Sequence, residues 1–258
     1  MERVRTVVVT GSASGIGQAT VARFASTGAR VIGVDLRDAQ VIADLATAQG
    51  RRTMCLEVER LAPQGVDTVV AVAGLASGDV RSVVAVNYFG AVATLQGLRP
   101  LLAKTPRPCA VAVVSTAALP ELMAMDAELV DACLAGDEAT ALAAAEGKGN
   151  AVYPSSKHAL ARWLRQAAVS AEWAGAGILL NAVAPGTVRT AMTAPFLATE
   201  EGRAFLQVAT PIAVNDYGQP EEIAEVLAFL GSLQGRYLLG QIVCVDGGTE
   251  ALARPALV

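Results

Sequence analysis

The sequence contains few of the residues that hold metal ions or build nucleophilic triads. It has one histidine, His158, and four scattered cysteines, none of them part of a C-x-x-C pair. A Cys/His zinc site needs several such ligands, so we expect no metal centre. A Ser-His-Asp triad would have to use His158, which directly follows Lys157, and we interpret this histidine as a structural or surface residue.

Long apolar runs and an excess of basic charge are also missing. The longest nearly uncharged stretch, CAVAVVSTAAL at 109–119, is about half the length that crosses a bilayer. The apolar run near the N-terminus is too short for an export signal. The net charge is −4, and no cluster of Lys and Arg is interleaved with aromatic residues. We therefore expect a cytoplasmic protein with neither a membrane nor a nucleic acid as partner.

Apolar segments rich in β-branched residues do recur along the chain, separated by segments with helical spacing. The apolar segments are continuous rather than alternating, which is typical of parallel strands covered on both faces. The pattern predicts an α/β protein with a doubly wound parallel sheet of about seven strands flanked by helices. We interpret residues 1–258 as a single domain. Six strands are expected at 5–11, 30–35, 66–74, 110–115, 178–186 and 241–248.

Two segments break this alternation. Residues 40–45, QVIADL, follow the second strand too closely for a crossover helix, so they form either a very short strand or a loop. Residues 119–150 carry no strand pattern, and we expect a helical hairpin inserted there with a turn at Gly136-Asp137. Its apolar face is expected to consist of Leu122, Met125, Leu129, Cys133 and Leu134.

A glycine-rich turn, TGSASGIGQAT, follows the first strand. Gly11 suits a tight turn, Gly15 lets the backbone approach a pyrophosphate, and Gly17 allows a helix to pack closely on a strand. The N-terminus of that helix offers free N–H groups to phosphate. Asp35 ends the next strand, where a carboxylate binds the adenosine ribose and repels the 2′-phosphate of NADP. The expected cofactor is NAD (NADH), although the long side chain of Arg37 could reach a 2′-phosphate.

The stretch AVYPSSKHAL places Tyr153 and Lys157 four positions apart, on one face of a helix. Proline is favoured in a first turn, so Pro154 predicts that this helix begins close to Tyr153. A tyrosine can supply the proton that a carbonyl oxygen takes up on reduction, provided that its pKa approaches neutrality. A lysine ammonium about 4 Å away would lower the tyrosine pKa by roughly three units at an effective dielectric near 20. We therefore predict that Tyr153 is an acid/base tuned by Lys157.

The glycine turn, Ser115 at a strand end and Tyr153-x-x-x-Lys157 together resemble the short-chain dehydrogenase/reductases, over Thr10 to Gly248. The resemblance implies a Rossmann-like fold and hydride transfer between NAD and an alcohol or ketone. It implies that Ser115 binds the substrate oxygen and that Lys157 also holds the nicotinamide ribose. The implied catalytic residues are Asn87, Ser115, Tyr153 and Lys157, with Asn87 ordering water. The implied cofactor contacts are Gly11, Ser14, Gly15, Ile16, Gly17, Asp35, Ala73, Gly74, Tyr153, Lys157, Pro185, Gly186, Val188 and Thr190.

Three details refine this resemblance. Ala71-Val72-Ala73-Gly74 stands where the family has Asn-Asn-Ala-Gly, a departure that affects strand and cofactor contacts rather than proton transfer. The short connection after Asp35 and the insertion at 119–150 are similar to a bacterial subgroup of the family, the 3α-hydroxysteroid dehydrogenase/carbonyl reductases. That similarity implies that Asp44 and Leu45 contact adenine.

Residues 191–216 follow the turn over the nicotinamide, where a lid would lie, and contain no Arg pair or Lys cluster. The expected substrate is therefore a hydrophobic ketone or secondary alcohol, such as a steroid or another xenobiotic carbonyl compound. Alternatives are acyl or sugar-like alcohols, or a non-catalytic NAD-sensing protein on the same fold. The apolar face of the insertion must be covered by the rest of the subunit, by substrate or by another subunit, and we expect a homo-oligomer, either a dimer or a tetramer. The apolar lid residues are Met192, Pro195, Phe196, Leu197 and Phe205.

Overall fold

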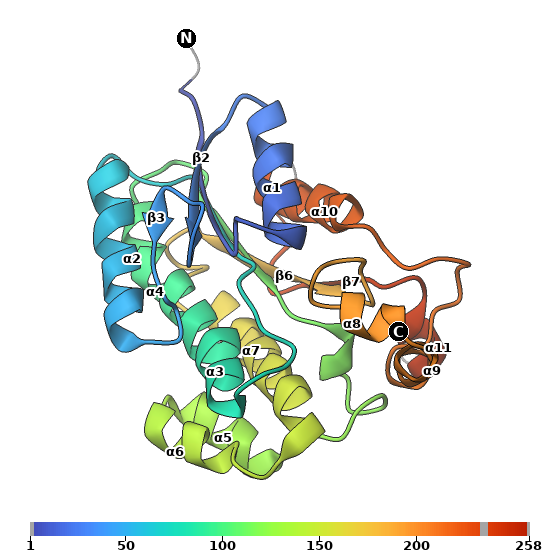
Figure 1. Ribbon diagram of the computed structural model, residues 1–258. Coiled ribbons are helices and arrows are strands. Elements are labelled where there is room, and N and C mark those ends of the chain that lie inside the picture. Colours follow the sequence, from blue (N-terminus) through green and yellow to red (C-terminus); the bar gives the residue numbers. More distant parts are fainter. Residues whose placement is uncertain (1–2, 233–236, 257–258) are drawn as a thin grey trace.

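A parallel sheet of seven strands runs through the computed structural model, which describes residues 3–232 and 237–256 (Figure 1). The strand order is β3-β2-β1-β4-β5-β6-β7, and all neighbouring strands are parallel. This confirms the expected α/β fold, and residues 40–45 include a strand of two residues. The strands are β1 (Thr6–Thr10), β2 (Arg30–Asp35), β3 (Val41–Ile42), β4 (Thr68–Ala71), β5 (Cys109–Val113), β6 (Leu179–Pro185) and β7 (Ile242–Val245).

Helices cover both faces of the sheet (Figure 1). Two of them, α1 (Gly15–Ser26) and α10 (Pro220–Ser232), pack together on one face. The other face is covered by α2 (Ala48–Leu61), α4 (Ala91–Leu102) and α7 (Val152–Ala168). No helix within the described residues is both long and apolar enough to cross a membrane. The remaining helices are α3 (Val80–Val84), α5 (Ala127–Ala135), α6 (Glu138–Ala144), α8 (Ala194–Ala198), α9 (Glu200–Ala209) and α11 (Thr249–Ala253).

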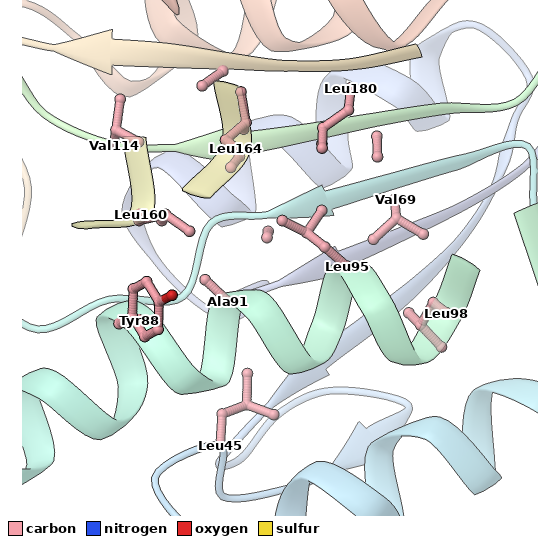
Figure 2. Close-up of a cluster of buried hydrophobic side chains, with 14 of the residues drawn as sticks. Leu45, Val69, Tyr88, Ala91, Leu95, Leu98, Val114, Leu160, Leu164 and Leu180 are labelled. Atoms are coloured by element: carbon pink, nitrogen blue, oxygen red, sulfur yellow. The ribbon is translucent and has the colours of Figure 1, made fainter. Parts of the chain in front are cut away.

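The continuous apolar strands fill two hydrophobic layers, one on each side of the sheet. In β1, Val8 packs toward α2, α4 and α7, whereas Val7 and Val9 pack toward α1 and α10, because successive side chains point to opposite faces. All three side chains are fully buried. Figure 2 shows part of the first layer, in which leucines of α4 and α7 belong to the same cluster as Val69 of β4. Burying a side chain of this kind contributes about 2 kcal/mol.

The edge of the sheet beside β2 is completed by a side chain. Strand β3 pairs only with Val34 and Asp35, so the residues before them have no strand partner on that side. The side-chain amide of Gln40 takes this place: its oxygen accepts a hydrogen bond from the N–H of Gly33 at 2.7 Å, and its nitrogen donates to the carbonyl of Val31 at 3.4 Å. One glutamine thus replaces a peptide group of a longer strand.

The insertion at 119–150 forms the expected helical hairpin, α5 and α6. The two helices are joined at Gly136, which has the left-handed backbone conformation common at helix ends. The expected apolar face is partly wrong, because α5 begins only after Asp126, so Leu122 and Met125 lie in the preceding loop. The two ends of the insertion are tied by an ion pair of 2.6 Å between Lys148 and Asp126.

Candidate active site

A cavity of about 510 Å³ opens at the carboxyl ends of the strands. Ligands of doubly wound sheets bind at this edge, where the strand order changes direction between β1 and β4. Every candidate site residue except Asn87 lines this one cavity. The residues concerned are Gly11, Ser14, Gly15, Ile16, Gly17, Asp35, Asp44, Leu45, Ala73, Gly74, Ser115, Tyr153, Lys157, Pro185, Gly186, Val188 and Thr190.

The glycine turn has the geometry of a phosphate cradle. Gly11 and Gly15 adopt left-handed backbone conformations with φ of +68° and +50°. A Cβ on Gly17 would lie 1.9 Å from the carbonyl oxygen of Gly11, so only glycine lets α1 pack this closely on β1. Ser14 is the N-cap of α1, yet its side chain makes no capping hydrogen bond. The N–H groups of the first helical turn are therefore available to an anionic group.

Asp35 fastens this cradle to the end of β2. Its carboxylate accepts hydrogen bonds from the backbone N–H groups of Ala13, at 2.9 Å, and Leu36, at 2.7 Å. Each carboxylate oxygen keeps a second lone pair for a hydroxyl group of a ligand. The residue therefore shapes the cradle and lines the cavity, and its contact with the adenosine ribose stays a prediction.

The unusual Ala71-Val72-Ala73-Gly74 segment is held by β1. The hydroxyl oxygen of Thr10 accepts hydrogen bonds from the N–H groups of Val72, at 3.1 Å, and Ala73, at 3.2 Å. These bonds draw the chain out of β4 immediately after Ala71 and into the cavity wall. A threonine side chain thus secures the segment in which the family pattern has two asparagines.

Tyr153 and Ser115 meet in the cavity. Helix α7 begins at Val152, as Pro154 predicts, so Tyr153 stands in its first turn. Ser115 lies just beyond β5, and its hydroxyl group shares the cavity wall with the Tyr153 phenol. The same oxygen accepts from the N–H of Ala117 at 3.1 Å, which fixes its position. Burial raises the pKa of Tyr153 above its ordinary value, and hydrogen bonding by the Ser115 side chain partly opposes this increase in pKa.

Lys157 lies one helical turn beyond Tyr153 and is 4% exposed. Its ammonium group donates a hydrogen bond of 2.9 Å to the backbone carbonyl of Val113. Burial lowers the pKa of Lys157 to about 8. The expectation that Lys157 lowers the pKa of Tyr153 is wrong for the protein alone, in which desolvation dominates and the Tyr153 pKa is raised.

Asn87 lies beside the cavity rather than in its wall. It is fully buried in a π-helical turn, Ala85–Gly90, between α3 and α4. Its amide nitrogen donates to the carbonyl of Leu75 at 2.9 Å and to the hydroxyl oxygen of Ser156 at 3.1 Å, and its oxygen accepts from the N–H of Leu75 at 2.8 Å. These bonds join the segment after β4 to helix α7. The ordering of water by Asn87 stays a prediction.

The only histidine supports the turn after Ser115. Nδ1 of His158 lies 2.9 Å from the carbonyl oxygen of Ala118, which can only accept, so this nitrogen carries the proton. The contact fits the structural interpretation of His158. Within residues 3–232 and 237–256, no group of three or more His, Cys, Asp or Glu side chains could hold a metal ion.

The lid segment reaches the cavity with only part of its apolar surface. Met192 lines the cavity, whereas Phe196 and Phe205 stack on each other with ring centroids 5.8 Å apart. Other apolar lining residues were not identified from the sequence, because each belongs to an ordinary apolar run. Three of them stand next to candidate site residues: Leu75 follows Gly74, Val86 precedes Asn87, and Val114 precedes Ser115.

Comparisons with known proteins extend over almost the whole chain. A family model described as enoyl-(acyl carrier protein) reductase matches residues 11–250. A 3-alpha-hydroxysteroid dehydrogenase/carbonyl reductase of Comamonas testosteroni is 38% identical over 96% of this chain and 98% of its own. A galactitol 2-dehydrogenase (L-tagatose-forming) of Cereibacter sphaeroides is 30% identical over 93% of this chain and 92% of its own. The crystal structure of the 3-alpha-hydroxysteroid dehydrogenase of Pseudomonas sp. B-0831, complexed with NADH, has a TM-score of 0.90 at 37% identity and covers 98% of this chain and 100% of that one.

Proposed function

Because the chain belongs to the short-chain dehydrogenase/reductase family, we propose that it is an NAD-dependent oxidoreductase that interconverts a hydrophobic secondary alcohol and its ketone. The observation that carries this proposal is that Ser115 and Tyr153 line the same cavity as the glycine cradle. Buried Lys157 lines that cavity one helical turn away. The proton-transfer groups and the nucleotide cradle therefore face one space.

Tyr153, Ser115 and Lys157 have separate roles in the proposed reaction. When bound, the cofactor supplies hydride to the carbonyl carbon or takes it from the alcohol carbon. Tyr153, whose raised pKa keeps it protonated at neutral pH, donates its proton to the carbonyl oxygen. The Ser115 hydroxyl group binds that oxygen and favours the phenolate that remains. Lys157 is placed to hold the ribose hydroxyl groups.

We expect the Asp35→Ala variant to lose much of the preference for NAD over NADP. A carboxylate about 4 Å from a 2′-phosphate costs roughly 4 kcal/mol at an effective dielectric near 20. Removing it should shrink the ratio of kcat/KM values for the two cofactors by at least about tenfold. Steady-state kinetics with NAD and NADP measure the ratio, and an unchanged ratio would contradict the role of Asp35. The double variant Asp35→Ala/Arg37→Ala shows whether Arg37 supplies part of any gain with NADP.

Apolar lining supports a hydrophobic substrate. Leu75, Val86, Val114 and Met192 line the cavity that holds Tyr153, and the similar proteins include hydroxysteroid dehydrogenases. A pocket of this kind favours a steroid or cyclic ketone over a polyol. The test is a panel of steroid, cyclic, acyl-thioester and polyol substrates, each assayed with both cofactors. Highest kcat/KM for an acyl thioester or a polyol would overturn the substrate class.

Two other functions are distinguished by the same panel. A sugar-like alcohol is favoured by the 30% identity with galactitol 2-dehydrogenase, and the polyol members of the panel test it. A non-catalytic NAD sensor would bind NADH and turn over none of the compounds. The presence of Ser115, Tyr153 and Lys157 in one cavity argues against a sensor, because nucleotide binding alone requires no proton donor.

We also propose that residues 1–258 form a single domain, because both hydrophobic layers are built on one sheet. A homo-oligomer is supported by the edge strand β7, whose four residues are all partly exposed. Light scattering measures the mass in solution, and a monomer would contradict this part of the proposal. A cytoplasmic location stays a prediction, which fractionation of the source cells would test.

A further inference from the structure

The segment Asp44–Ala46 forms one end of the cavity, between β3 and α2. All three residues line the cavity, and none of them belongs to a helix or strand. Leu45 fixes the segment from below: it is 6% exposed, and Figure 2 shows its side chain directed toward the helix that carries Tyr88 and Ala91. A Cβ on Gly90 would lie 3.1 Å from the Cβ of Leu45, so the contact is close. Packing thus fixes the side chain of Leu45, and the path of the backbone depends on the groups that form hydrogen bonds with it.

Arg51 holds that backbone from helix α2. Its guanidinium group donates to the carbonyl oxygens of Leu45, at 3.1 Å, and Ala46, at 3.4 Å. The residue is buried, with 8% of its surface exposed. A buried guanidinium group needs partners for its charge and its donors, and carbonyl oxygens satisfy the donors only.

The counter-charge comes from the insertion. Glu138, the first residue of α6, accepts a hydrogen bond of 2.5 Å from the second terminal nitrogen of Arg51. The two residues are 87 positions apart in the sequence. No residue of α5 or α6 lines the cavity, and this ion pair links the first residue of α6 to the side chain that holds the carbonyl groups of Leu45 and Ala46.

We propose that Glu138, acting through Arg51, positions the Asp44–Ala46 segment for the adenine half of the nucleotide. Because the proposal rests on the NAD-dependent function, it assigns the insertion a task in cofactor affinity. Without the carboxylate, the guanidinium group would turn toward solvent or another acceptor, and the carbonyl oxygens of Leu45 and Ala46 would lose their donor. Both residues of the pair are positioning residues, since neither lines the cavity.

The test compares two glutamates of the insertion. The side chain of Glu138 is 32% exposed, so Glu138→Ala and Glu138→Gln should fold. The matched control is Glu146→Ala, which removes an ion pair of 2.6 Å with Arg81, neither member of which lines the cavity. Isothermal titration calorimetry with NADH and with ADP-ribose gives Kd for each protein. We expect Glu138→Ala to raise both Kd values by about three- to tenfold, Glu138→Gln to raise them less, and Glu146→Ala to leave them unchanged.

A rate measurement separates positioning from general loosening. At saturating NADH, kcat of Glu138→Ala with the best substrate of the panel should equal that of the wild type. Unchanged Kd values in Glu138→Ala, or equal changes in Glu146→Ala, would overturn the inference. The titrations need no turnover. A wild-type protein that binds NADH without turning over any substrate would overturn the proposed function, and the Kd values of the variants would still decide the inference. A wild-type protein that binds neither compound would overturn both.

Discussion

Tyr153→Phe lowers kcat/KM for ketone reduction by about 10²- to 10⁴-fold, the range expected when a general acid is removed. The change deletes one hydroxyl group and leaves the ring, so α7 keeps its packing. Steady-state kinetics measure the loss. Circular dichroism and titration with NADH should show a folded protein whose affinity for NADH stays within a few-fold of the wild type.

A second tyrosine provides the matched control for this prediction. Tyr88 is also buried, at 2% exposure, but does not line the cavity. Tyr88→Phe should therefore keep its turnover within a few-fold of the wild type. If Tyr153→Phe retained comparable activity, Tyr153 would not be the proton donor, and the assignment of the site would fall.

Lys157→Met should make the protein more stable at pH 7 while reducing its activity. Burial moves the pKa of Lys157 from the ordinary 10.5 to about 8, which corresponds to a cost of about 3 kcal/mol for keeping the ammonium charged in the folded state. Methionine avoids this cost but loses the hydrogen bond from the charged ammonium to Val113, worth about 2 kcal/mol. We expect a net gain of about 1 kcal/mol in the free energy of unfolding.

The sign of the pH dependence follows from proton binding. Between pH 8 and 10.5 the unfolded chain holds a proton on Lys157 that the folded chain has released. The wild type therefore gains stability as the pH rises through this window, whereas Lys157→Met does not. The difference in the free energy of unfolding between the two proteins therefore shrinks. Urea denaturation at pH 7 and pH 10 measures it. Lys104→Met, which changes an exposed lysine, should show no such narrowing, and a variant less stable than the wild type at pH 7 would contradict the argument.

Local signals in the sequence predict most of the fold and much of the site. Continuous apolar runs identify strands, and Pro154 identifies the start of α7, because these features act within a few residues of one another. The glycine turn is equally local, since the contact between Gly17 and Gly11 spans only six positions. Seventeen candidate residues therefore lie around one cavity, although their roles stay proposals.

Features that depend on distant partners could not be predicted. Lys157 shares a helix face with Tyr153, but its ammonium group takes a carbonyl acceptor of β5, a contact that requires the folded sheet. Asn87 directs its amide toward Leu75 and Ser156 instead of the cavity wall. Arg51 and Glu138 look like ordinary surface charges in the sequence, because nothing local shows that the first residue of α6 lies within ion-pair distance of α2.

The amide of Gln40 has a consequence for association between molecules. Strand edges with free N–H and C=O groups are templates on which strands of other chains can add, leading to aggregation. Beside Gly33 and Val31 those groups are already bonded within the chain, although β3 is too short to cover them. The short connection after Asp35 therefore leaves no continuous template along the outer side of β2, so a side chain protects the sheet where backbone does not reach.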